Sequence, residues 1–455
     1  MLLIRNRLAA MVAVSVVGVV AGVIALAGPL NPPAGAVSST YKTLTEVEPR
    51  IAINSTNTPG NASATYRITQ PGSYYLTGNV SGQSGKSGIS IESGNVTLDL
   101  CGFSIIGVSG SIDGITMPAF AESVVIRNGI VSAWGRHGVR TLIDVGRVEG
   151  ITVTRNGGWG IDNQSQPTFS THLSHCEAFG NGAIVASTGG IRVGESALVT
   201  DSLARGNTGH GFATAGGYVR FVGCASMDCT ADGFNSTGIE TSLTNCTVGY
   251  AAVVAVRLGD RGSLVDCTIS QPSGSGVILG SLARMAGCNV RSVGAAITAL
   301  DDGVFIECSV TSSVGVGVSA RDGNHFSNCR VSGCLGDGFN VRFGNHFEGC
   351  QARSNQGDGI ESSSGGHILN CQLDGNGSGA TVGANIRITG DACRIEGNSL
   401  IGADFGIQTT SGGNVIVRNS SRNSANSYGG ISAGNDVGPI GSAATATSPW
   451  ANIQY

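Results

Sequence analysis

GNHFSNCRVSGCLGDGFNVRFGNHFEGC, residues Gly323 to Cys350, contains Asn-His-Phe followed two residues later by Cys, and repeats that phrase 21 residues further on. His and Cys are common zinc ligands, so His325, Cys329, His346 and Cys350 suggest a metal site. The alternative is that the duplication is itself the structural signal, because self-similarity at a fixed period marks repeat architectures.

The cysteines of this phrase belong to a long column. From Cys224 onward its members are 20 to 22 residues apart, and the column extends towards the N-terminus through Cys176, Ser202, Ile151 and Gly129. Because Ile cannot ligate a metal, the column predicts an interior position of a solenoid and not a zinc site. The cysteines predicted to be structural are Cys224, Cys246, Cys267, Cys288, Cys308, Cys329, Cys350, Cys371 and Cys393.

Other columns keep the same frame. An apolar residue such as Leu173 or Phe326 lies three positions before most column members, and Asn or Cys, such as Asn355 or Cys334, lies five positions after many of them. A Gly and an apolar residue follow nine and ten positions after it. These patterns predict short strands separated by corners at which Asn adopts the left-handed conformation. No amphipathic helix interrupts the units, so strands of successive coils are expected to pair in parallel.

With these features the chain resembles the right-handed parallel β-helix family, the pectin-lyase-like superfamily. The segments QPGSYYLTGNV and GISIESGNVTLDLCGFSIIG resemble the start of secreted bacterial proteins of this type. The resemblance implies an all-β solenoid with a period of about 21–22 residues and about fourteen coils. It says much less about activity.

Four segments are expected. Residues 1–36 are interpreted as a signal peptide, because Arg5 and Arg7 precede an apolar run that ends before the small residues Ala34 to Ala36. The alternative is that this run is retained as a membrane anchor. Residues 37–88 are expected to cap the solenoid, residues 89–423 to form it, and the Gly/Ser/Ala-rich residues 424–455 to form a C-terminal tail and cap. The predicted location is secreted or cell-surface.

Composition limits the partners. The formal net charge is -4, and the only lysines are Lys42 and Lys86. Nucleic acid is therefore not expected as the main partner, because phosphate binding needs a clustered cationic excess. No membrane contact is expected beyond the N-terminal run, and the chain is expected to be a monomer.

Thirteen cysteines in an exported chain ordinarily indicate disulfides. In a stacked column, however, equivalent side chains point the same way and not at each other. We favour a buried stack of free thiols that pack as small hydrophobic groups, and vertical disulfides are the alternative.

The histidines lie one position earlier than the inner apolar column and so face outward. His325, His346 and His367 form consecutive steps, and Arg284 and Arg220 lie in the same column nearer the N-terminus. This stripe is a candidate site for an acidic or hydroxylated polymer, because a solenoid presents equivalent groups at a fixed pitch. The alternative is a solvated strand face that was duplicated together with its coil.

A second candidate is acidic. Asp337 and Asp358 precede the Gly of adjacent coils, and Glu361 lies close to the second of them. Three carboxylates could hold Ca²⁺, which is the one cofactor considered. Asp-Gly is also a common turn sequence, and the turn interpretation is favoured.

Two classes of function follow. The first is a non-catalytic exported solenoid that binds polysaccharide or partner proteins through its side walls. The second is a polysaccharide lyase or glycoside hydrolase that acts on acidic glycans with a nonstandard site. Gly209-His210-Gly211 matches a short motif of polygalacturonase-like hydrolases, but the other motifs of those enzymes are missing and no Lys follows Lys86. No catalytic residue is assigned.

Overall fold

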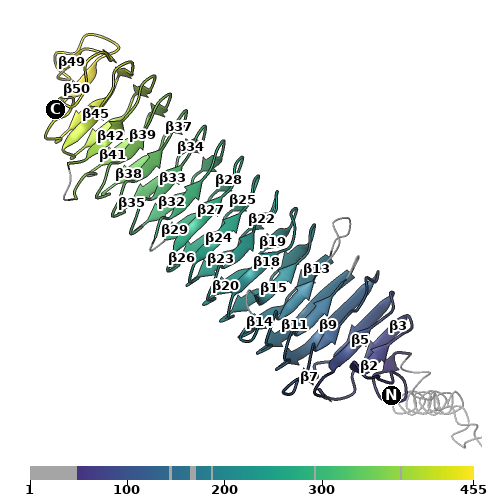
Figure 1. Cartoon of the computed structure of the whole chain (residues 1–455). Helices are drawn as coiled ribbons and strands as arrows, with labels where there is room; N and C mark the ends of the chain where they lie inside the picture. Colours follow the sequence, from purple (N-terminus) through teal and green to yellow (C-terminus); the bar gives the residue numbers. More distant parts are fainter. Residues whose placement is uncertain (1–48, 143–145, 164–170, 186–187, 292–293, 380–381) are drawn as a thin grey trace, which may run out of the picture. The chain divides into compact units, whose positions relative to one another are not determined.

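The computed structural model describes residues 49–142, 146–163, 171–185, 188–291, 294–379 and 382–455. The predicted signal peptide lies outside these ranges. Within the unit Arg50–Tyr455 the regular elements are all β-strands, and nearly every one pairs in parallel with its equivalents in the coils before and after it (Figure 1). No helix long and apolar enough to cross a membrane occurs in the described part of the chain.

Each regular coil contains three strands, and the coil that includes Cys350 is typical. Its strands are β36 (Phe339–Val341), β37 (His346–Glu348) and β38 (Gln351–Arg353). The first belongs to sheet B, which has 16 strands, and the other two belong to sheet A, which has 34. Sheet B, with one strand per coil, consists of β2 (Ala64–Ile68), β5 (Ser87–Ile91), β8 (Ile115–Thr116), β10 (Val139–Thr141), β12 (Ile161–Asn163), β15 (Gly189–Val193), β18 (His210–Thr214), β21 (Phe234–Ser236), β24 (Val254–Leu258), β27 (Ser275–Leu279), β30 (Ile297–Ala299), β33 (Val318–Ala320), β36, β39 (Ile360–Ser362), β42 (Ala384–Ile388) and β45 (Phe405–Thr409).

The solenoid is therefore slightly longer than the predicted fourteen coils. Its ladder begins upstream of residue 89, because β2 pairs with β5 and β1 (Ile51–Ala52) pairs with β3 (Gly72–Tyr75). At the other end, β48 (Asp436–Val437) and β50 (Asn452–Gln454) extend the ladders of β46 (Val415–Val417) and β47 (Ser420–Arg422).

The core is built from the inner columns that the spacing predicts. Phe326 lies between Phe305 and Phe347, with ring centroids 4.8 and 4.9 Å apart, and all three side chains are buried. Phe339 of sheet B meets Phe347 edge-on at 5.2 Å. Burying one such side chain contributes about 1.5–3 kcal/mol, so a column repeated in every coil stabilises each coil against its neighbours.

The corners differ from the prediction. The left-handed residue is the one immediately before the Cys column, as in Asn328 with φ 53° and Gly349 with φ 63°, or before the Asn column, as in Ser354 with φ 53°. The Asn side chains five positions after Cys turn inward instead. Asn355 and Asn376 are almost fully buried, and the amide of Asn355 donates to the Asn376 side-chain oxygen at 2.9 Å. These hydrogen bonds between stacked Asn side chains satisfy polar groups at a buried bend, where an unpaired polar group would cost stability.

The cysteine column is interior, as predicted, and its thiols are free. All thirteen cysteines are unpaired, and only Cys101 is exposed. The Cys350 Sγ donates to the Phe326 carbonyl at 3.3 Å, and burial raises the pKa of Cys176 to about 12. Ser202 shares the column, because its hydroxyl accepts from the Cys176 N–H.

Cys393 is a correction to the predicted column. The register pairs His367 with Arg394 and Leu369 with Glu396, so Asn398 and not Cys393 is equivalent to Cys371. The Cys371 N–H donates to the Asn398 side chain at 2.9 Å. The coil between them is about five residues longer than the average period, which shifts the frame. Cys393 is still buried, but its Sγ accepts from Gly366 N–H in a different column.

Candidate ligand-binding surface

Three histidines stack on the outer face of sheet A. His325 on β34 (His325–Ser327), His346 on β37 and His367 on β40 (His367–Leu369) occupy equivalent positions of adjacent strands. The first two rings are 4.8 Å apart and nearly parallel, at 8°, whereas the second and third are 5.7 Å apart and tilted by 56°. Partial burial and the two neighbouring imidazoles lower the pKa of His346, so this ring is neutral at pH 7.

The arginines adjoin the three histidines differently from the prediction. The predicted arginines on the N-terminal side do not directly adjoin them, whereas an unpredicted arginine adjoins them on the C-terminal side. Arg284 lies in the predicted column, but Val304 separates it from His325. Arg220 is four coils from Val304, with Ser242 and Ser263 between it and Arg284. On the far side Arg394, on β43 (Arg394–Glu396), directly follows His367. The sequence frame missed Arg394 because it placed Cys393 in the wrong column.

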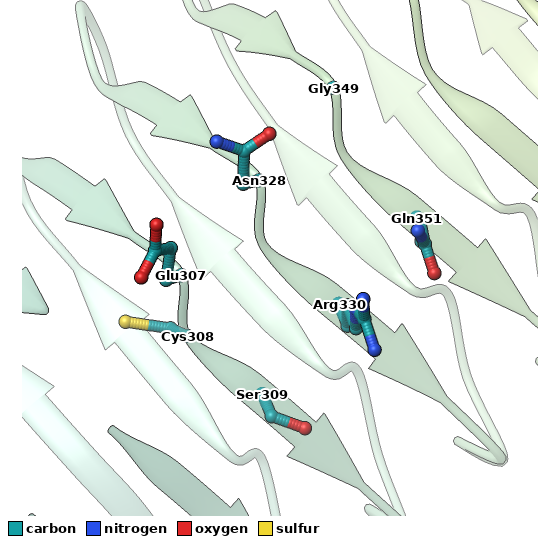
Figure 2. A pocket seen from close by; sticks show the side chains of 7 residues that line it. All are labelled: Glu307, Cys308, Ser309, Asn328, Arg330, Gly349 and Gln351. Atoms are coloured by element: carbon teal, nitrogen blue, oxygen red, sulfur yellow. The ribbon is translucent and has the colours of Figure 1, made fainter. Parts of the chain in front are cut away.

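A polar groove lies at the sheet A corner of the same coils. It has a volume of about 480 Å³ and is lined by Glu307, Cys308, Ser309, Asn328, Arg330, Gly349 and Gln351. Figure 2 shows these residues on successive coils, with the side chains of Glu307 and Asn328 extending from equivalent corners. Sequence reasoning did not identify the groove, because only the corner geometry turns the residue before each Cys outward.

The predicted carboxylate cluster is assembled on sheet B. Oxygens of Asp337, Asp358 and Glu361 lie within 4.8 Å of one another. Burial, followed by the charges of Asp337 and Asp358, raises the pKa of Glu361. The cluster is partly compensated, because Arg387 pairs with Asp358 at 2.5 Å and the Asp358 carboxylate also accepts from the Ala384 N–H. Carboxylate oxygens suit Ca²⁺, but two of the three groups, Asp337 and Asp358, already accept hydrogen bonds from protein donors.

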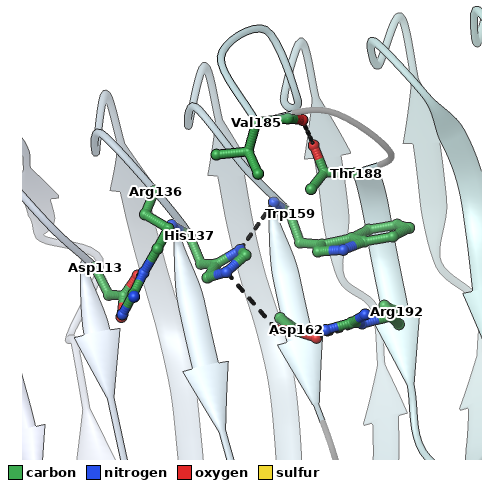
Figure 3. Close-up of polar contacts among 8 residues, drawn as sticks. All are labelled: Asp113, Arg136, His137, Trp159, Asp162, Val185, Thr188 and Arg192. Carbon is green, nitrogen blue, oxygen red and sulfur yellow. Dashed lines mark hydrogen bonds and ion pairs between the residues drawn. The ribbon is translucent and has the colours of Figure 1, made fainter. Parts of the chain in front are cut away.

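A second polar network, which the sequence did not reveal, lies on sheet B nearer the N-terminus (Figure 3). The buried Asp113 carboxylate accepts from Arg136 Nε at 2.8 Å. His137 Nδ1 accepts from the Trp159 N–H at 3.0 Å, and its Nε2 lies 3.8 Å from Asp162. Arg192 binds Asp162 through Nε at 2.7 Å and Nη2 at 2.9 Å.

This network, which we call the sheet B network, joins successive coils, and each of its buried carboxylates pairs with an arginine. Both nitrogens of His137 face protein partners, and burial lowers the pKa of His137 despite the nearby carboxylates. His210, the histidine of the Gly-His-Gly motif, lies three coils after His137 in the same sheet B column. It lies beside Asn235, which donates to Asp232 at 3.1 Å. The histidine that matches the hydrolase motif therefore belongs to the same column of sheet B as His137.

Comparisons with known proteins agree with this fold. A family model described as "Right handed beta helix region" matches residues 232–385 and 279–422. No curated protein sequence matches the chain.

Solved structures that resemble the chain include the Azotobacter vinelandii mannuronan C-5 epimerase AlgE6 A-module, at 15% identity over 85% of this chain and 91% of that chain, with a TM-score of 0.30. Bacteriophage CBA120 tailspike protein 3 has 14% identity over 85% and 59% of the two chains, with a TM-score of 0.30. PfbA, a surface adhesin of Streptococcus pneumoniae, has 11% identity over 80% and 83%, with a TM-score of 0.26.

The strand register, the inner columns and the family match lead to the same assignment. Residues 50–455 contain two parallel sheets whose strands pair through successive coils, and the family match lies within them. The chain is a right-handed parallel β-helix protein.

Proposed function

We propose that the protein is an exported, non-catalytic β-helix, acting as a single chain, that binds polysaccharide along the side wall formed by sheet A. The observation that carries the proposal is a coincidence of position. The polar groove shares the coils between residues 304 and 351 with the first two rings of the stack, His325 and His346, and His367 lies one coil further on. On the surface only the outward column that contains Ser327 and Glu348 separates the groove from these two rings.

The chemistry of the groove suits a hydroxylated polymer. A sugar hydroxyl donates and accepts, and the groove offers the carboxylate of Glu307, the amides of Asn328 and Gln351 and the guanidinium of Arg330. A few converging polar groups in a concave site are typical of small-molecule recognition. Equivalent positions recur at about 4.8 Å along the solenoid, so a polymer that follows the wall meets a polar position at a regular spacing.

The His stack adds a charge preference. His346 has a lowered pKa, so this ring is neutral at pH 7 and gains positive charge as the solution becomes acidic. A polymer of uronic acids is therefore expected to bind more tightly at about pH 5.5 than at about pH 7.5, whereas a neutral glucan should not change.

Calorimetry with polygalacturonate, alginate and dextran tests the proposal. Arg330→Ala should weaken binding of the acidic polymers about tenfold or more, because a hydrogen bond to a charged group is worth about 1.5–3 kcal/mol. Arg291→Ala is the matched control, since Arg291 is exposed on the same face of sheet A, on β29 (Asn289–Arg291), outside the groove. Equal losses in the two variants, or no binding by the wild type, would overturn the proposal.

The alternative is a polysaccharide lyase or glycoside hydrolase. One observation favours it: the raised pKa of Glu361 beside Asp358 places a protonatable carboxyl next to a carboxylate, as acid–base catalysis of glycoside cleavage requires. Release of reducing ends or unsaturated products from either uronate polymer, lost in Glu361→Gln, would establish this alternative and exclude the non-catalytic proposal.

A further inference from the structure

A separate pocket lies at the C-terminal end of sheet A. It has a volume of about 420 Å³, within the range of about 300–1,000 Å³ that small-molecule sites occupy. Val415 and Val417 of β46 and Pro439 contribute apolar surface, Trp450 contributes an indole ring, and Arg394 and Asp436 contribute charge.

Trp450 is unlike the other two tryptophans of the chain. It is 47% exposed, whereas Trp134 is 1% exposed and Trp159 is 3% exposed. A large exposed aromatic side chain in a pocket is a recognition feature, because it combines apolar area with low conformational entropy.

The indole is held in place before any ligand arrives. The Arg418 guanidinium lies 4.1 Å from the centre of the indole, donates from Nε to the Pro449 carbonyl at 3.1 Å and pairs with Glu396 at 2.9 Å. The Trp450 main chain also packs so closely on Gly438 that a Cβ there would lie 2.0 Å from the Trp450 carbonyl oxygen. Preorganisation of this kind reduces the entropy cost of binding.

The polar groups lie close to the aromatic one. Arg394 pairs with Glu396 at 2.6 Å, and Glu396 also pairs with Arg418. Asp436 is exposed. The pocket therefore combines an aromatic ring and apolar surface with charged donors and acceptors. A pyranose ring has the complementary shape, with a face of C–H groups and an edge of hydroxyls.

The pocket continues the His stripe. The register runs from His367 to Arg394, then to Val415, then to Asp436. His346 and Val415 are three coils apart, which is about 14 Å at the strand spacing of a parallel sheet. One polymer chain that follows sheet A can therefore reach both places.

We propose that the Trp450 pocket is a second glycan-binding site, which stacks a pyranose ring on the indole and holds the same polysaccharide chain that lies along the His stripe. The inference rests on the proposed function for the identity of the polymer. It adds a site, a stacking residue and a dependence on chain length, because two linked contacts bind more tightly than either alone.

Fluorescence isolates this site without a label. Trp134 and Trp159 are buried, so iodide quenches Trp450 selectively. Long oligogalacturonides that can reach both sites should protect the fluorescence from iodide and shift it to shorter wavelength in the full chain. Trp450→Phe, which keeps an aromatic ring, should abolish the protection and retain part of the affinity, whereas Trp450→Ala should lower the affinity for long oligogalacturonides about tenfold or more. The same substitutions of Trp450 should have a smaller effect on the affinity of the groove for oligomers that are too short to span both sites.

The outcomes separate the two proposals. Calorimetric binding that depends on Arg330 but leaves Trp450 fluorescence and iodide quenching unchanged overturns the second site and leaves the groove. Protection of Trp450 that is unaffected by Arg330→Ala overturns the groove and supports the pocket. Equal affinity of Trp450→Ala and wild type for long oligogalacturonides overturns the inference, and circular dichroism of each variant establishes that the coil is intact.

Discussion

The sheet B network and the outer face of sheet A both contain histidines and arginines, but the two regions differ in how far these side chains are buried and paired. On sheet B, Asp113 and Asp162 are fully buried and bound to arginines, and His137 has partners at both nitrogens. On sheet A, His325, His346 and Arg330 retain exposed surface, and a groove lies beside them. The comparison shows that residue type alone does not identify a structural column, because the same residue types are buried and paired on sheet B but keep exposed surface on sheet A.

The physical reason is the cost of desolvation. A buried charge must be paired, and the pair is then unavailable to a ligand. An exposed row at coil spacing has no such requirement and can exchange water for a ligand. The largest effects of mutation on stability should therefore lie on sheet B, and the largest effects on binding should lie on sheet A.

The largest expected effect is on stability. Asp162→Ala leaves Arg192 and His137 without their carboxylate, and breaking a buried ion pair by removing one partner costs about 3–5 kcal/mol. The midpoint of urea unfolding, followed by circular dichroism, measures this change. Polysaccharide binding by the folded fraction should stay at the wild-type level.

Asp374→Ala is the control for that experiment. It removes the partner of Arg353 in a pair whose side chains are 72% and 42% exposed, so the change should be within about 1 kcal/mol. If the two variants had equal midpoints, or if Asp162→Ala lost binding while folded, the division between the two faces would be wrong.

The sequence predicted what depends on a constant period and missed what depends on register across irregular coils. The inner phenylalanine column, the interior cysteines and the outward histidines all follow from a step near 21 residues. Asp162 and Arg192 are 30 residues apart, and His367 and Arg394 are 27 apart, because loops of variable length separate their strands. Such partners cannot be aligned by spacing, so the sheet B network and Arg394 required the structure.

The corner groove was missed for a different reason. Glu307 and Asn328 face outward because each adopts a positive φ at a corner, and no hydrophobic pattern records that conformation at a polar position. The next corner of each coil, at which Ser354 has the positive φ, turns the Asn355 and Asn376 side chains inward, the reverse of what polarity alone predicts.

A smaller effect is expected at the cysteine column. Cys350→Ser should cost about 1 kcal/mol or less, because Ser202 already occupies this column and a hydroxyl can donate to the Phe326 carbonyl as the thiol does. Chelators should not shift the unfolding midpoint of the wild type. In the native protein only Cys101 should react with a thiol reagent, and the other twelve thiols should react after unfolding. Zinc-dependent stability would restore the metal interpretation of the repeat.

The His stack should give a weaker, pH-dependent effect. The pKa of His346 is lowered in the folded protein, so the unfolded state binds the proton first as pH falls. The contribution of His346 to the free energy of unfolding is therefore complete above the ordinary pKa of about 6.5 and declines as pH falls below it. The decline is less than about 1 kcal/mol, because the ring is partly solvated. His346→Gln should flatten the change in unfolding midpoint between about pH 7.5 and pH 5. In an NMR titration, polygalacturonate should raise the His346 pKa, whereas dextran should not; an unchanged value with both polymers would separate the stack from the ligand.

The smallest effect is expected at Glu361, where the sign is opposite. Its pKa is raised in the folded protein, so the unfolded state loses the proton first and the contribution of Glu361 declines as pH rises through the folded value. Glu361→Gln should therefore raise the unfolding midpoint at pH 7, by a few tenths of a kcal/mol in free energy, and leave it unchanged near pH 4. Glu177→Gln, at an exposed position of β14 (Glu177–Phe179), is the control and should change neither value.

Calcium distinguishes the two interpretations of this cluster. If Asp337, Asp358 and Glu361 are a turn whose charges Arg387 partly balances, millimolar Ca²⁺ should leave the wild-type midpoint unchanged and Glu361→Gln should remain the more stable form. If they hold the ion, Ca²⁺ should stabilise the wild type, because a ligand that binds only the folded state adds to its stability. Glu361→Gln would then become the less stable form in Ca²⁺. The order of stability of the two proteins with and without the ion thus decides whether this part of sheet B is a structural column, like the sheet B network, or a binding surface, as we propose for sheet A.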